Sequence, residues 1–443
     1  MPWDSSSHSP CRNRRKPASP TERVALNRHH APNPPNNAPT SVTPGSQAAP
    51  RLRSLDALRG FDMLWILGAD AILHGLKGFT DNAFTRFLAD QFEHKAWEGF
   101  AFYDLIFPLF VFIVGVSLVF SLRRALARDG RGGALRRVCR RSLLLYALGV
   151  FYYGGFAKEW PEIRLLGVLQ RIALCYCVAG LCFSLFKPRT LAAITTGLLV
   201  GYWALLTWVP FPDVRPEPGG TQPVWRDTGF DHVEQLNLES TNRVRGVFLP
   251  GVNLAHYVDQ RWLPGYKWDG TWDPEGLLST LPAIGTCLLG VFAGLLLRDG
   301  RWRDGQKVLW LLGVGAVAVA LGWLWHLQFP VIKKIWTSSY VLVAAGYSAW
   351  LLAGFYYVIE VWRWEKWAMP FVWIGMNPIT VYVGSALVNY ESVAQRLAGG
   401  SVAKWLDATL TPGAGEALLA ILTLGIAVGF CRFLYRRNLF LRL

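Results

Sequence analysis

The chain has 443 residues, of which 52% are hydrophobic and 17% charged, and its 45 Lys and Arg outnumber its 30 Asp and Glu. Soluble domains carry about 25% charged residues. The apolar content excludes a disordered chain, and seven Cys in 443 residues exclude a disulfide-stapled secreted scaffold. A net charge of +15 would suit a nucleic-acid binder, but the long apolar runs indicate a polytopic membrane protein that binds no nucleic acid.

Apolar stretches of about 20 residues, the length that crosses a hydrocarbon core of about 30 Å, recur along the chain. Ten of them predict transmembrane helices at roughly 57–76, 102–122, 142–157, 165–186, 191–210, 276–297, 308–327, 338–361, 370–390 and 415–435. The third is short and is followed by Gly154-Gly155. We therefore expect an all-α polytopic membrane protein with about ten transmembrane helices.

Lys and Arg gather on one side of these predicted helices. If the N-terminus is cytoplasmic, the inner segments hold 28 of the 45 basic residues and the outer segments hold 15. Cytoplasmic loops carry the excess of Lys and Arg, and an even number of spans puts both ends on one side. We therefore expect cytoplasmic N and C termini and one long outer loop, 211–275. Its many Pro, Gly, Trp and Asp predict a lid or small irregular subdomain.

The first 50 residues have a different composition. Residues 34–50 are rich in Pro, Asn, Ser and Thr and cannot bury a core, so we expect a disordered cytoplasmic tail before a transmembrane domain at 51–443. No apolar stretch precedes residue 57, which speaks against a cleavable signal peptide. Two other interpretations of the first 50 residues stay open. The start codon could be assigned too far upstream, or the basic run at 12–16 could contact anionic membrane lipid.

Common catalytic and metal-binding patterns are not found in the sequence. There is no HxH or HExxH pair, no GxSxG, no GxxxxGK[ST] and no complete GxGxxG. Zinc, hydrolase-elbow, P-loop and Rossmann chemistry are therefore unsupported, and we expect no metal. No Cys falls in a predicted outer loop, so no outer disulfide is expected.

Ionisable side chains at membrane depth are costly and suggest function. Asp70 lies about 13 residues into the first predicted span, and Arg171, beside Gln170, lies about two turns into the fourth. Asp70 and Arg171 are therefore expected at similar depth in the outer leaflet. Two interpretations stay open, a buried ion pair that locks two helices and the wall of a polar cavity that faces a substrate.

The segment before the second span combines a histidine with aromatic residues. It reads Glu93-His94-Lys95-Ala96-Trp97-Glu98-Gly99 and continues through Asp104 to Pro108. Imidazole can take up a proton near neutral pH, as a general base does. Asp104 could orient this imidazole, or it could merely complement the helix dipole. A histidine with no role beyond the membrane interface is the competing interpretation of His94.

Five short motifs resemble one known family. The first, Arg51-Leu-Arg-Ser-Leu-Asp56-Ala-Leu-Arg59-Gly60, resembles the start of the heparan-alpha-glucosaminide N-acetyltransferase family and its bacterial relatives. The other four, in order, are His94-x-x-Trp97-x-Gly99 running into Asp104-Leu-x-Phe107-Pro108, Arg164-Leu-Leu-Gly-Val-Leu-Gln170-Arg171, Asp273-Pro-Glu-Gly-Leu-Leu-Ser-Thr-Leu-Pro282 and Gly375-Met-Asn377-Pro. The order of all five makes the resemblance specific, and it is strongest to the bacterial branch.

The resemblance implies an integral membrane acyltransferase that transfers acetyl from cytosolic acetyl-CoA to an amino sugar or glycan on the other side of the membrane. The family's active histidine falls on His94, which would act as base or acetyl carrier. The family's asparagine in the first span falls on Asp70, a departure that leaves the detailed mechanism and the acceptor open. We expect a bacterial inner membrane with a periplasmic acceptor, since we see no lysosomal targeting region.

The resemblance and the residue chemistry together give a set of candidate site residues. Catalytic candidates are His94, Asp104 and Asp70, and candidates for binding substrate or cofactor are Arg171, Gln170, Trp97, Asn377, Arg59 and Arg164. Arg59 and Asn377 are expected on the acetyl-CoA side, although a snorkelling Arg and an Asn-Pro helix break explain them as well. The tryptophans of the long loop, Trp225, Trp262, Trp268 and Trp272, could stack on sugar rings or anchor the loop at the interface.

The expected partners are acetyl-CoA, the acceptor and membrane lipid, and a homodimer is left open. Two rival functions also fit the sequence. One is a transporter or exporter of a small polar solute, which would also use buried charges and broken helices. The other is an O-acetyltransferase of an envelope polysaccharide, which keeps the chemistry and changes the acceptor.

Overall fold

The structure is a computed structural model that describes residues 52–69, 72, 82–216 and 222–440. The predicted tail at 1–50 and the candidate Asp70 lie outside the described residues. Nearly all regular structure is helical, as predicted. The α-helices are α1 (Arg53–Ile66), α3 (Ala83–Gln91), α4 (Ile106–Tyr152), α5 (Val168–Leu185), α6 (Pro188–Trp208), α7 (Leu254–Trp262), α8 (Thr280–Arg298), α9 (Asp304–His326), α10 (Ser338–Tyr356), α11 (Met369–Gly375), α12 (Pro378–Val388), α13 (Tyr390–Ala398), α14 (Ser401–Thr409) and α15 (Ala414–Arg436).

Within the described residues, seven helices are long and apolar enough to cross a membrane. An eighth span is formed if α11 and α12, which are bent by 66° relative to each other, are counted as one broken helix. The polytopic all-α architecture is therefore confirmed, whereas the number ten stays a prediction. The first predicted span, 57–76, continues beyond α1 into residues that are not described.

Helix α4 contains two of the predicted spans because it reverses direction at Gly130. This residue has φ +67° and ψ −174°, a conformation outside the helical region that glycine adopts easily. Leu118 and Val138, on either side of it, both lie against Gly180 of α5. Twenty residues of straight helix would separate them by about 30 Å, so the two parts of α4 must run antiparallel. The basic segment 123–141 includes this turn, as the charge pattern predicted.

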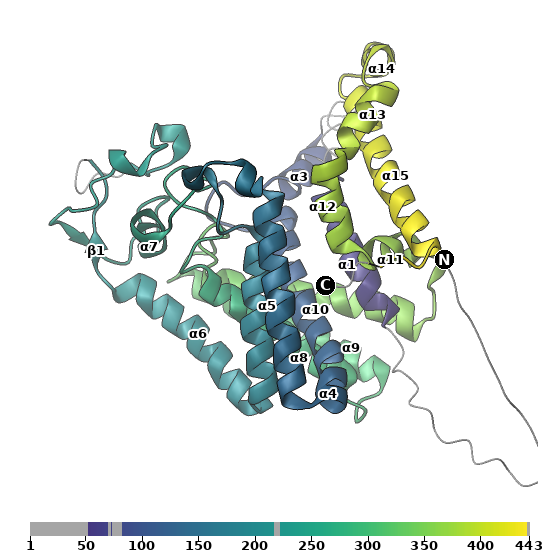
Figure 1. The fold of residues 1–443 in the computed structure, drawn as a ribbon, viewed down its shortest axis with the longest axis horizontal. Helices are drawn as coiled ribbons and strands as arrows, with labels where there is room; N and C mark the ends of the chain where they lie inside the picture. Colours follow the sequence, from purple (N-terminus) through teal and green to yellow (C-terminus); the bar gives the residue numbers. More distant parts are fainter. Residues whose placement is uncertain (1–51, 70–71, 73–81, 217–221, 441–443) are drawn as a thin grey trace, which may run out of the picture. The chain divides into compact units, whose positions relative to one another are not determined.

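The ninth predicted span is broken at Asn377-Pro378. Proline lacks the N–H that an unbroken helix needs, and it starts α12 at the position where this loss costs least. The helix break that was one interpretation of this dipeptide is therefore confirmed. Beyond α12, the short helices α13 and α14 occupy the segment 391–413, which was expected to be a loop (Figure 1).

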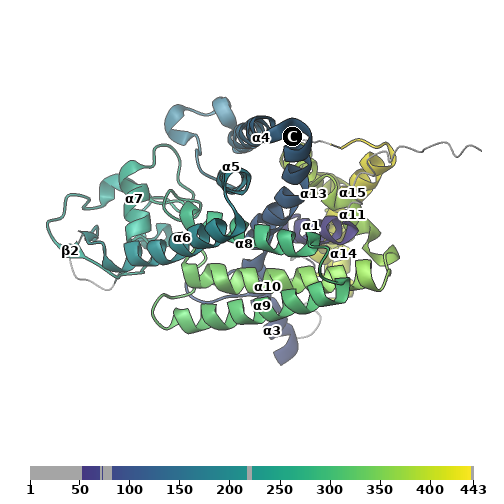
Figure 2. The same ribbon diagram turned by 90° about the horizontal axis from the view of Figure 1, so that it is seen from below.

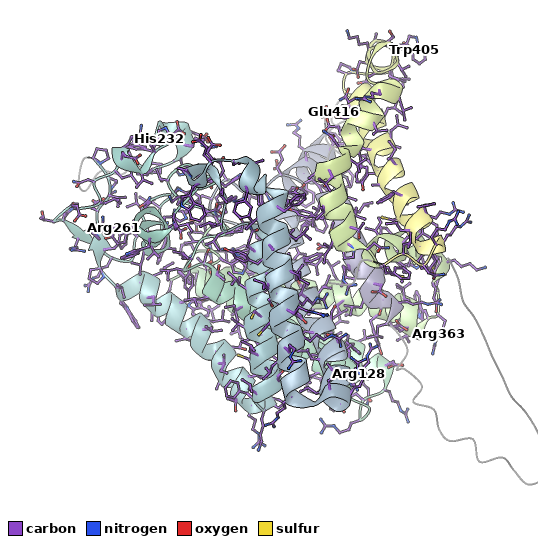
Figure 3. The ribbon with its side chains drawn as sticks, viewed as in Figure 1. Arg128, His232, Arg261, Arg363, Trp405 and Glu416 are labelled. Carbon is purple, nitrogen blue, oxygen red and sulfur yellow. The ribbon has the colours of Figure 1, made fainter. Side chains whose placement is uncertain are left out.

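Segments that were predicted to share a side of the membrane do lie at the same end of the helices. Arg164 forms an ion pair with Asp273, which joins two predicted outer segments. Glu98 pairs with Ile332 in an antiparallel bridge, which joins two others. At the other end, Arg53 forms an ion pair with Glu365. Figure 3 shows the same separation, with Arg128 near the reversal of α4 and His232 of the long outer loop at opposite ends.

The long outer loop folds into a small subdomain with its own apolar core. Its two short strands, β1 (Phe211–Pro212) and β2 (Arg243–Val244), pair antiparallel with Phe211 opposite Val244. Its helix α7, which the irregular composition did not predict, begins after Asn253, whose side chain accepts a hydrogen bond from the His256 N–H at 2.9 Å. The core is formed by residues that include Tyr202, Phe211, Val252 and Phe329. The subdomain is therefore packed onto α6 and the segment after α9.

Close backbone contacts between helices hold the helices that carry the site. A Cβ atom on Gly60 of α1 would lie 1.7 Å from the Phe371 carbonyl oxygen of α11, and one on Gly115 of α4 would lie 1.9 Å from the Cys287 carbonyl oxygen of α8. Only glycine permits such approaches, which are common where helices associate in lipid.

Helices α9 and α10 also lie side by side along their length (Figure 2).

Candidate active site

His94 and Asp104 form a hydrogen-bonded pair at the outer end of α4. The distance from His94 Nδ1 to an Asp104 carboxylate oxygen is 2.9 Å. Asp104 is fully buried in the 3₁₀ turn Phe102–Leu105 that precedes α4, whereas the His94 side chain is 52% exposed. The pair therefore joins a fixed carboxylate to an accessible imidazole. The sequence prediction that Asp104 orients His94 agrees with this geometry.

The Asp104 carboxylate is held by backbone groups. Its second oxygen accepts hydrogen bonds from the Ala101 N–H at 3.1 Å and the Lys95 N–H at 3.3 Å. The Tyr340 hydroxyl of α10 donates to the Asp104 carbonyl at 2.7 Å. These contacts fix the carboxylate at the start of α4, where a negative charge also complements the helix dipole. The position of Asp104 is therefore consistent with both interpretations offered by the sequence, and its role stays a prediction.

A third charged group, Lys333, comes from the segment between α9 and α10. The segments are held together by a hydrogen bond from the Gly99 N–H to the Val331 carbonyl at 2.9 Å, next to the bridge between Glu98 and Ile332. Lys333 Nζ lies 2.9 Å from His94 Nδ1, 3.3 Å from His94 Nε2 and 3.4 Å from the Asp104 carboxylate. The site thus combines residues that are 239 positions apart in the sequence.

The turn after Lys333 is strained and tightly packed. Trp336 has φ +51°, an uncommon value for a bulky residue. Its buried indole donates to the Thr286 hydroxyl at 3.1 Å and packs edge-on against Phe107 at a ring-centre distance of 5.0 Å. Burial of the indole compensates for the strained backbone, and the turn holds Lys333 beside the imidazole.

The position of Lys333 indicates which nitrogen of His94 carries the proton. Because Nζ is nearly equidistant from both ring nitrogens, it lies over the ring rather than in its plane, so the contact with Nδ1 is no ordinary hydrogen bond. With the ring proton on Nδ1, His94 would donate to Asp104, and Nε2, which lies 3.3 Å from Lys333 Nζ, would be the acceptor nitrogen. This is the arrangement in which a carboxylate orients a catalytic histidine.

Lys333 is itself in an unusual environment. Its side chain is only 22% exposed, and burial lowers its pKa, while the nearby Asp104 carboxylate favours the charged form and limits that decrease. A lysine of this kind can place a positive charge next to a reacting group at neutral pH. Lys333 was not among the residues picked from the sequence. One feature of the sequence could have indicated it. Lys333 and Lys334 are adjacent basic residues in a short outer segment, whereas basic residues were predicted to gather in the inner segments.

Trp97 connects the pair to the outer subdomain. Its indole donates to the Phe248 carbonyl at 2.8 Å. Its ring centre lies 5.9 Å from that of Trp225 and 6.1 Å from that of Trp272. Trp97 is therefore part of an aromatic cluster that begins three residues after His94, which fits its predicted role in substrate binding.

Arg164 and Gln170 have structural contacts that the sequence did not predict. Arg164 is buried and bonds both oxygens of Asp273, at 2.9 and 2.8 Å, and Glu275 at 2.6 Å. Gln170 donates to the Arg164 carbonyl at 3.3 Å. Arg164 therefore joins the segment before α5 to the segment before α8, and its charge is neutralised within the protein.

Arg171 is fully buried and lies between α5 and α8. It donates hydrogen bonds to Ser279 and to the Gly276 carbonyl, and its guanidinium lies 5.0 Å from the centre of the Trp336 ring. Within the described part of the chain its Nε and Nη1 atoms have no hydrogen-bond partner. The expected pairing with Asp70 stays a prediction, because Asp70 is not described.

The candidates Arg59 and Asn377 meet where α1 crosses the break between α11 and α12. Arg59 donates to Asp56 at 3.0 Å, to the Gly375 carbonyl at 2.9 Å and to the Ser117 hydroxyl at 2.7 Å. Asn377 is 1% exposed, and neither atom of its side-chain amide has a hydrogen-bond partner among the described residues. Buried amides without partners are costly, so Asn377 is the better candidate of the two for contact with a ligand.

No group of three or more His, Cys, Asp or Glu residues that could hold a metal ion occurs among the residues with described coordinates. The candidate site in the described regions thus consists of a histidine, a carboxylate and an ammonium group. The fold and this site describe one class of protein. It is a polytopic helical membrane protein with a histidine–aspartate pair at the outer end of a transmembrane helix.

Comparisons with known proteins point to the same family as the five motifs. Residues 51–214 match the family model described as heparan-alpha-glucosaminide N-acetyltransferase, catalytic. The human heparan-alpha-glucosaminide N-acetyltransferase is 28% identical over 377 residues, which cover 76% of this chain and 53% of the human protein. The mouse protein is 28% identical over 351 residues, or 69% of this chain and 51% of its own. The chain thus spans about half the length of the curated relatives it matches.

The family model and the two relatives support the resemblance to the heparan-alpha-glucosaminide N-acetyltransferase family that the five motifs indicated. The matched region 51–214 contains seven of the described candidate residues, which are Arg59, His94, Trp97, Asp104, Arg164, Gln170 and Arg171. Lys333 lies outside that region. Membership in the bacterial branch stays a prediction.

Proposed function

We propose that the protein is an integral membrane acyltransferase that transfers acetyl from acetyl-CoA to the amino group of a glucosamine-type sugar. The observation that carries this proposal is the His94–Asp104 pair, in which Nδ1 of a half-exposed imidazole lies 2.9 Å from a buried carboxylate. Both matched relatives are named for N-acetyl transfer to a glucosaminide. Acyl transfer needs a base or nucleophile together with a group that stabilises negative charge, and His94 and Lys333 supply these two.

In direct transfer, Nε2 of His94 removes a proton from the acceptor amine as the amine nitrogen attacks the thioester carbonyl carbon. The C–N bond forms, the C–S bond breaks, and the imidazolium returns its proton to the departing thiolate of coenzyme A. Negative charge on the carbonyl oxygen is stabilised by the Lys333 ammonium, which lies 3.3 Å from Nε2. In the alternative route, Nε2 attacks the thioester carbonyl carbon, the C–S bond breaks and coenzyme A leaves as the thiolate. The amine then attacks the acetyl-imidazole, the C–N bond to the imidazole breaks, and the amine proton passes to the released imidazole nitrogen.

The donor would reach this site from the cytoplasmic side. Arg123 and Arg124 of α4 lie near Arg298 of α8 at the opposite end of the helices, close enough to repel one another. A cluster of like charges is suited to the phosphates of a nucleotide. The unpartnered amide of Asn377 could then bond the amide groups of the pantetheine arm. This agrees with the basic inner rim inferred from the sequence.

The proposed setting is a bacterial inner membrane, with both termini in the cytoplasm and the acceptor in the periplasm. A disordered tail at 1–50, contacts with lipid and a homodimer are parts of the same proposal. Asp70, at the family's asparagine position, would adjust the charge near the acceptor.

A purified-protein assay tests the function directly. Wild-type protein in lipid nanodiscs should release coenzyme A from acetyl-CoA when glucosamine or a chitosan fragment is added, and His94→Ala should abolish the release. His232→Ala is the matched control, because His232 is an exposed histidine of the outer subdomain away from the pair. If wild type releases no coenzyme A with any amino sugar or glycan and instead takes up a solute in liposomes, the transporter function replaces the proposed one.

The same assay separates the two routes and the two kinds of acceptor. Exchange of labelled coenzyme A into acetyl-CoA without any acceptor requires an acetyl-histidine and does not occur in direct transfer. Mass spectrometry of the product distinguishes an amide, stable to mild alkali, from the alkali-labile ester of an O-acetyltransferase.

A further inference from the structure

A pocket in the outer subdomain lies next to the candidate active site. It has a volume of about 290 Å³ and is lined by Trp225, Arg226, Asp227, Tyr266, Trp268, Asp269, Trp272 and Lys334. We call it the Trp268 pocket. Ligand pockets commonly range from about 300 to 1,000 Å³, so this one suits a single small ring. Half of its lining residues are aromatic and the other half are charged.

Cations behind the aromatic rings hold the walls of the pocket in place. Lys334 Nζ lies 5.1 Å from the centre of the Trp225 ring and 5.3 Å from that of Trp272. The Arg164 guanidinium lies 4.9 Å from the Trp268 ring. Each contact is a cation–π interaction. The rings are therefore positioned before a ligand arrives, which reduces the entropy lost on binding.

The buried side of the pocket wall is also fixed. His256 stacks on Trp272 with a ring-centre distance of 3.6 Å and an angle of 13° between the ring planes. Its Nδ1 accepts a hydrogen bond from the Gly251 N–H at 2.9 Å. Trp272 itself is fully buried, so it forms the floor of the pocket rather than its rim.

The charged groups of the pocket largely neutralise one another. Lys334 bonds Asp269 at 2.8 Å, and Arg226 lies 3.4 Å from Asp231. Asp227 is exposed and forms no ion pair with the described residues, so its carboxylate can accept hydrogen bonds from a ligand. A pocket of this kind suits a ring with one apolar face and several hydroxyl groups, which is the chemistry of a pyranose sugar.

The pocket and the histidine–aspartate pair are connected through two short contacts. Lys334 lines the pocket, and the preceding residue, Lys333, lies over the His94 ring. Trp97, three residues after His94, contacts both Trp225 and Trp272. His94, Asp104 and Lys333 do not line the pocket themselves. A ring held there is therefore beside the reacting centre and not at it.

We propose that the Trp268 pocket binds the sugar ring next to the one that is acetylated, with the apolar face of the pyranose on Trp268 and its hydroxyl groups bonded to Asp227 and Asp269. This inference rests on the proposed function. It makes the acceptor a glycan of at least two sugars, because a single glucosamine cannot occupy the pocket and reach His94 at once.

The test compares a glucosamine disaccharide with glucosamine. In wild type, the disaccharide should have a KM about tenfold lower, the gain expected for one stacked ring. Trp268→Ala should raise the KM for the disaccharide about tenfold, leave the kinetics with glucosamine unchanged, and leave the KM for acetyl-CoA unchanged. Trp268→Phe should restore most of the preference, because it keeps an aromatic face.

Trp262→Ala is the matched control. Trp262 is an exposed tryptophan of α7 in the same subdomain, but it does not line the pocket. It should behave as wild type with both acceptors. Equal KM values for the disaccharide in wild type and Trp268→Ala would overturn the proposal while the acetyltransferase function stands.

A binding measurement separates the pocket from the chemistry. The disaccharide should quench the tryptophan fluorescence of both wild type and His94→Ala, and the quench should be much smaller in Trp268→Ala. If no variant transfers acetyl but this pattern of quenching is seen, the proposed function fails and the sugar pocket stands. If the disaccharide binds to none of them, the pocket proposal fails.

Discussion

Replacement of Asp104 by Asn tests whether the carboxylate orients His94 for proton transfer. In the proposed mechanism, the buried carboxylate accepts a hydrogen bond from Nδ1–H, at a distance of 2.9 Å, and Nε2 is the base. In Asp104→Asn, the side-chain oxygen can still accept the hydrogen bonds from Ala101 and Lys95. The amide NH₂ group would then face Nδ1 and donate to it, which places the ring proton on Nε2. The free lone pair that takes the acceptor's proton would be lost.

The magnitude follows from the charge and the distance. A unit charge 2.9 Å from an imidazolium contributes about 6 kcal/mol at an effective dielectric of about 20 and about 1.4 kcal/mol in water. The carboxylate is buried while the imidazole is half exposed, so the true value lies between these limits. Together with the change of tautomer, we expect kcat to fall roughly 1,000- to 10,000-fold, the range seen when a triad aspartate is replaced by asparagine.

Initial rates of coenzyme A release, at saturating acetyl-CoA and glucosamine, measure this effect. Thermal unfolding should change little, because the shape and the backbone hydrogen bonds of Asp104 are kept. Asp90→Asn is the control, since Asp90 is an exposed carboxylate at the end of α3. A kcat for Asp104→Asn within threefold of the wild type would refute the orienting role of Asp104 and remove the main support for His94 as base.

The remaining predictions concern one further catalytic group and two buried charges. Lys333→Met should lower kcat about 100-fold, the effect of losing one group that stabilises an oxyanion. Because burial lowers the pKa of Lys333, wild-type activity should also decline with rising pH below the usual range of a lysine, and Lys333→Arg should move that decline to higher pH in a pH–rate profile. Burial raises the pKa of Asp259 to about 8, against an ordinary value of 3.8. Its contribution to stability is therefore fully present below about pH 4 and is lost as the pH rises through about 8, a change of at most about 6 kcal/mol. Thermal scans should show this decline in wild type and not in Asp259→Asn. Arg164→Met should destabilise the protein by about 3 to 5 kcal/mol, because it leaves Asp273 and Glu275 buried without a countercharge. In the same thermal scans, the exposed pair of Arg261 and Glu239 should contribute less than about 1 kcal/mol, so Arg261→Met is the control.

The predicted spans and the reversal of α4 show what apolar runs and charge can specify. Apolar runs and charge are local properties of the sequence. An apolar stretch must become a helix in lipid, and a basic segment stays on the cytoplasmic side. Gly130 lies within the basic segment 123–141, and the chain turns there. The break at Asn377-Pro378 could be predicted for the same reason, because the loss of a proline N–H is felt within one turn.

The roles of Arg164 and Arg171 could not be predicted, because they depend on contacts between distant segments. Arg164 lies in a family motif and resembles a binding residue, but Asp273 and Glu275, more than 100 positions later, neutralise it. Arg171 was expected beside Asp70, which lies outside the described residues, and its described hydrogen bonds join α5 to the start of α8. A sequence shows that such a charge needs a partner, and packing decides which one it finds.

Lys333 shows most clearly why the candidate site could be predicted only in part. His94 and Asp104 are ten positions apart, so the turn before α4 can bring them together by local folding. Lys333 reaches them only because the backbone of Gly99 pairs with that of Val331, and backbone pairing leaves no mark in side-chain identity. The same pairing brings Lys334, and with it the Trp268 pocket, close to His94. This two-residue bridge and the contacts of Trp97 with Trp225 and Trp272 therefore both connect the His94–Asp104 pair to the Trp268 pocket. A mutation that loosens this bridge should weaken proton transfer and acceptor binding together.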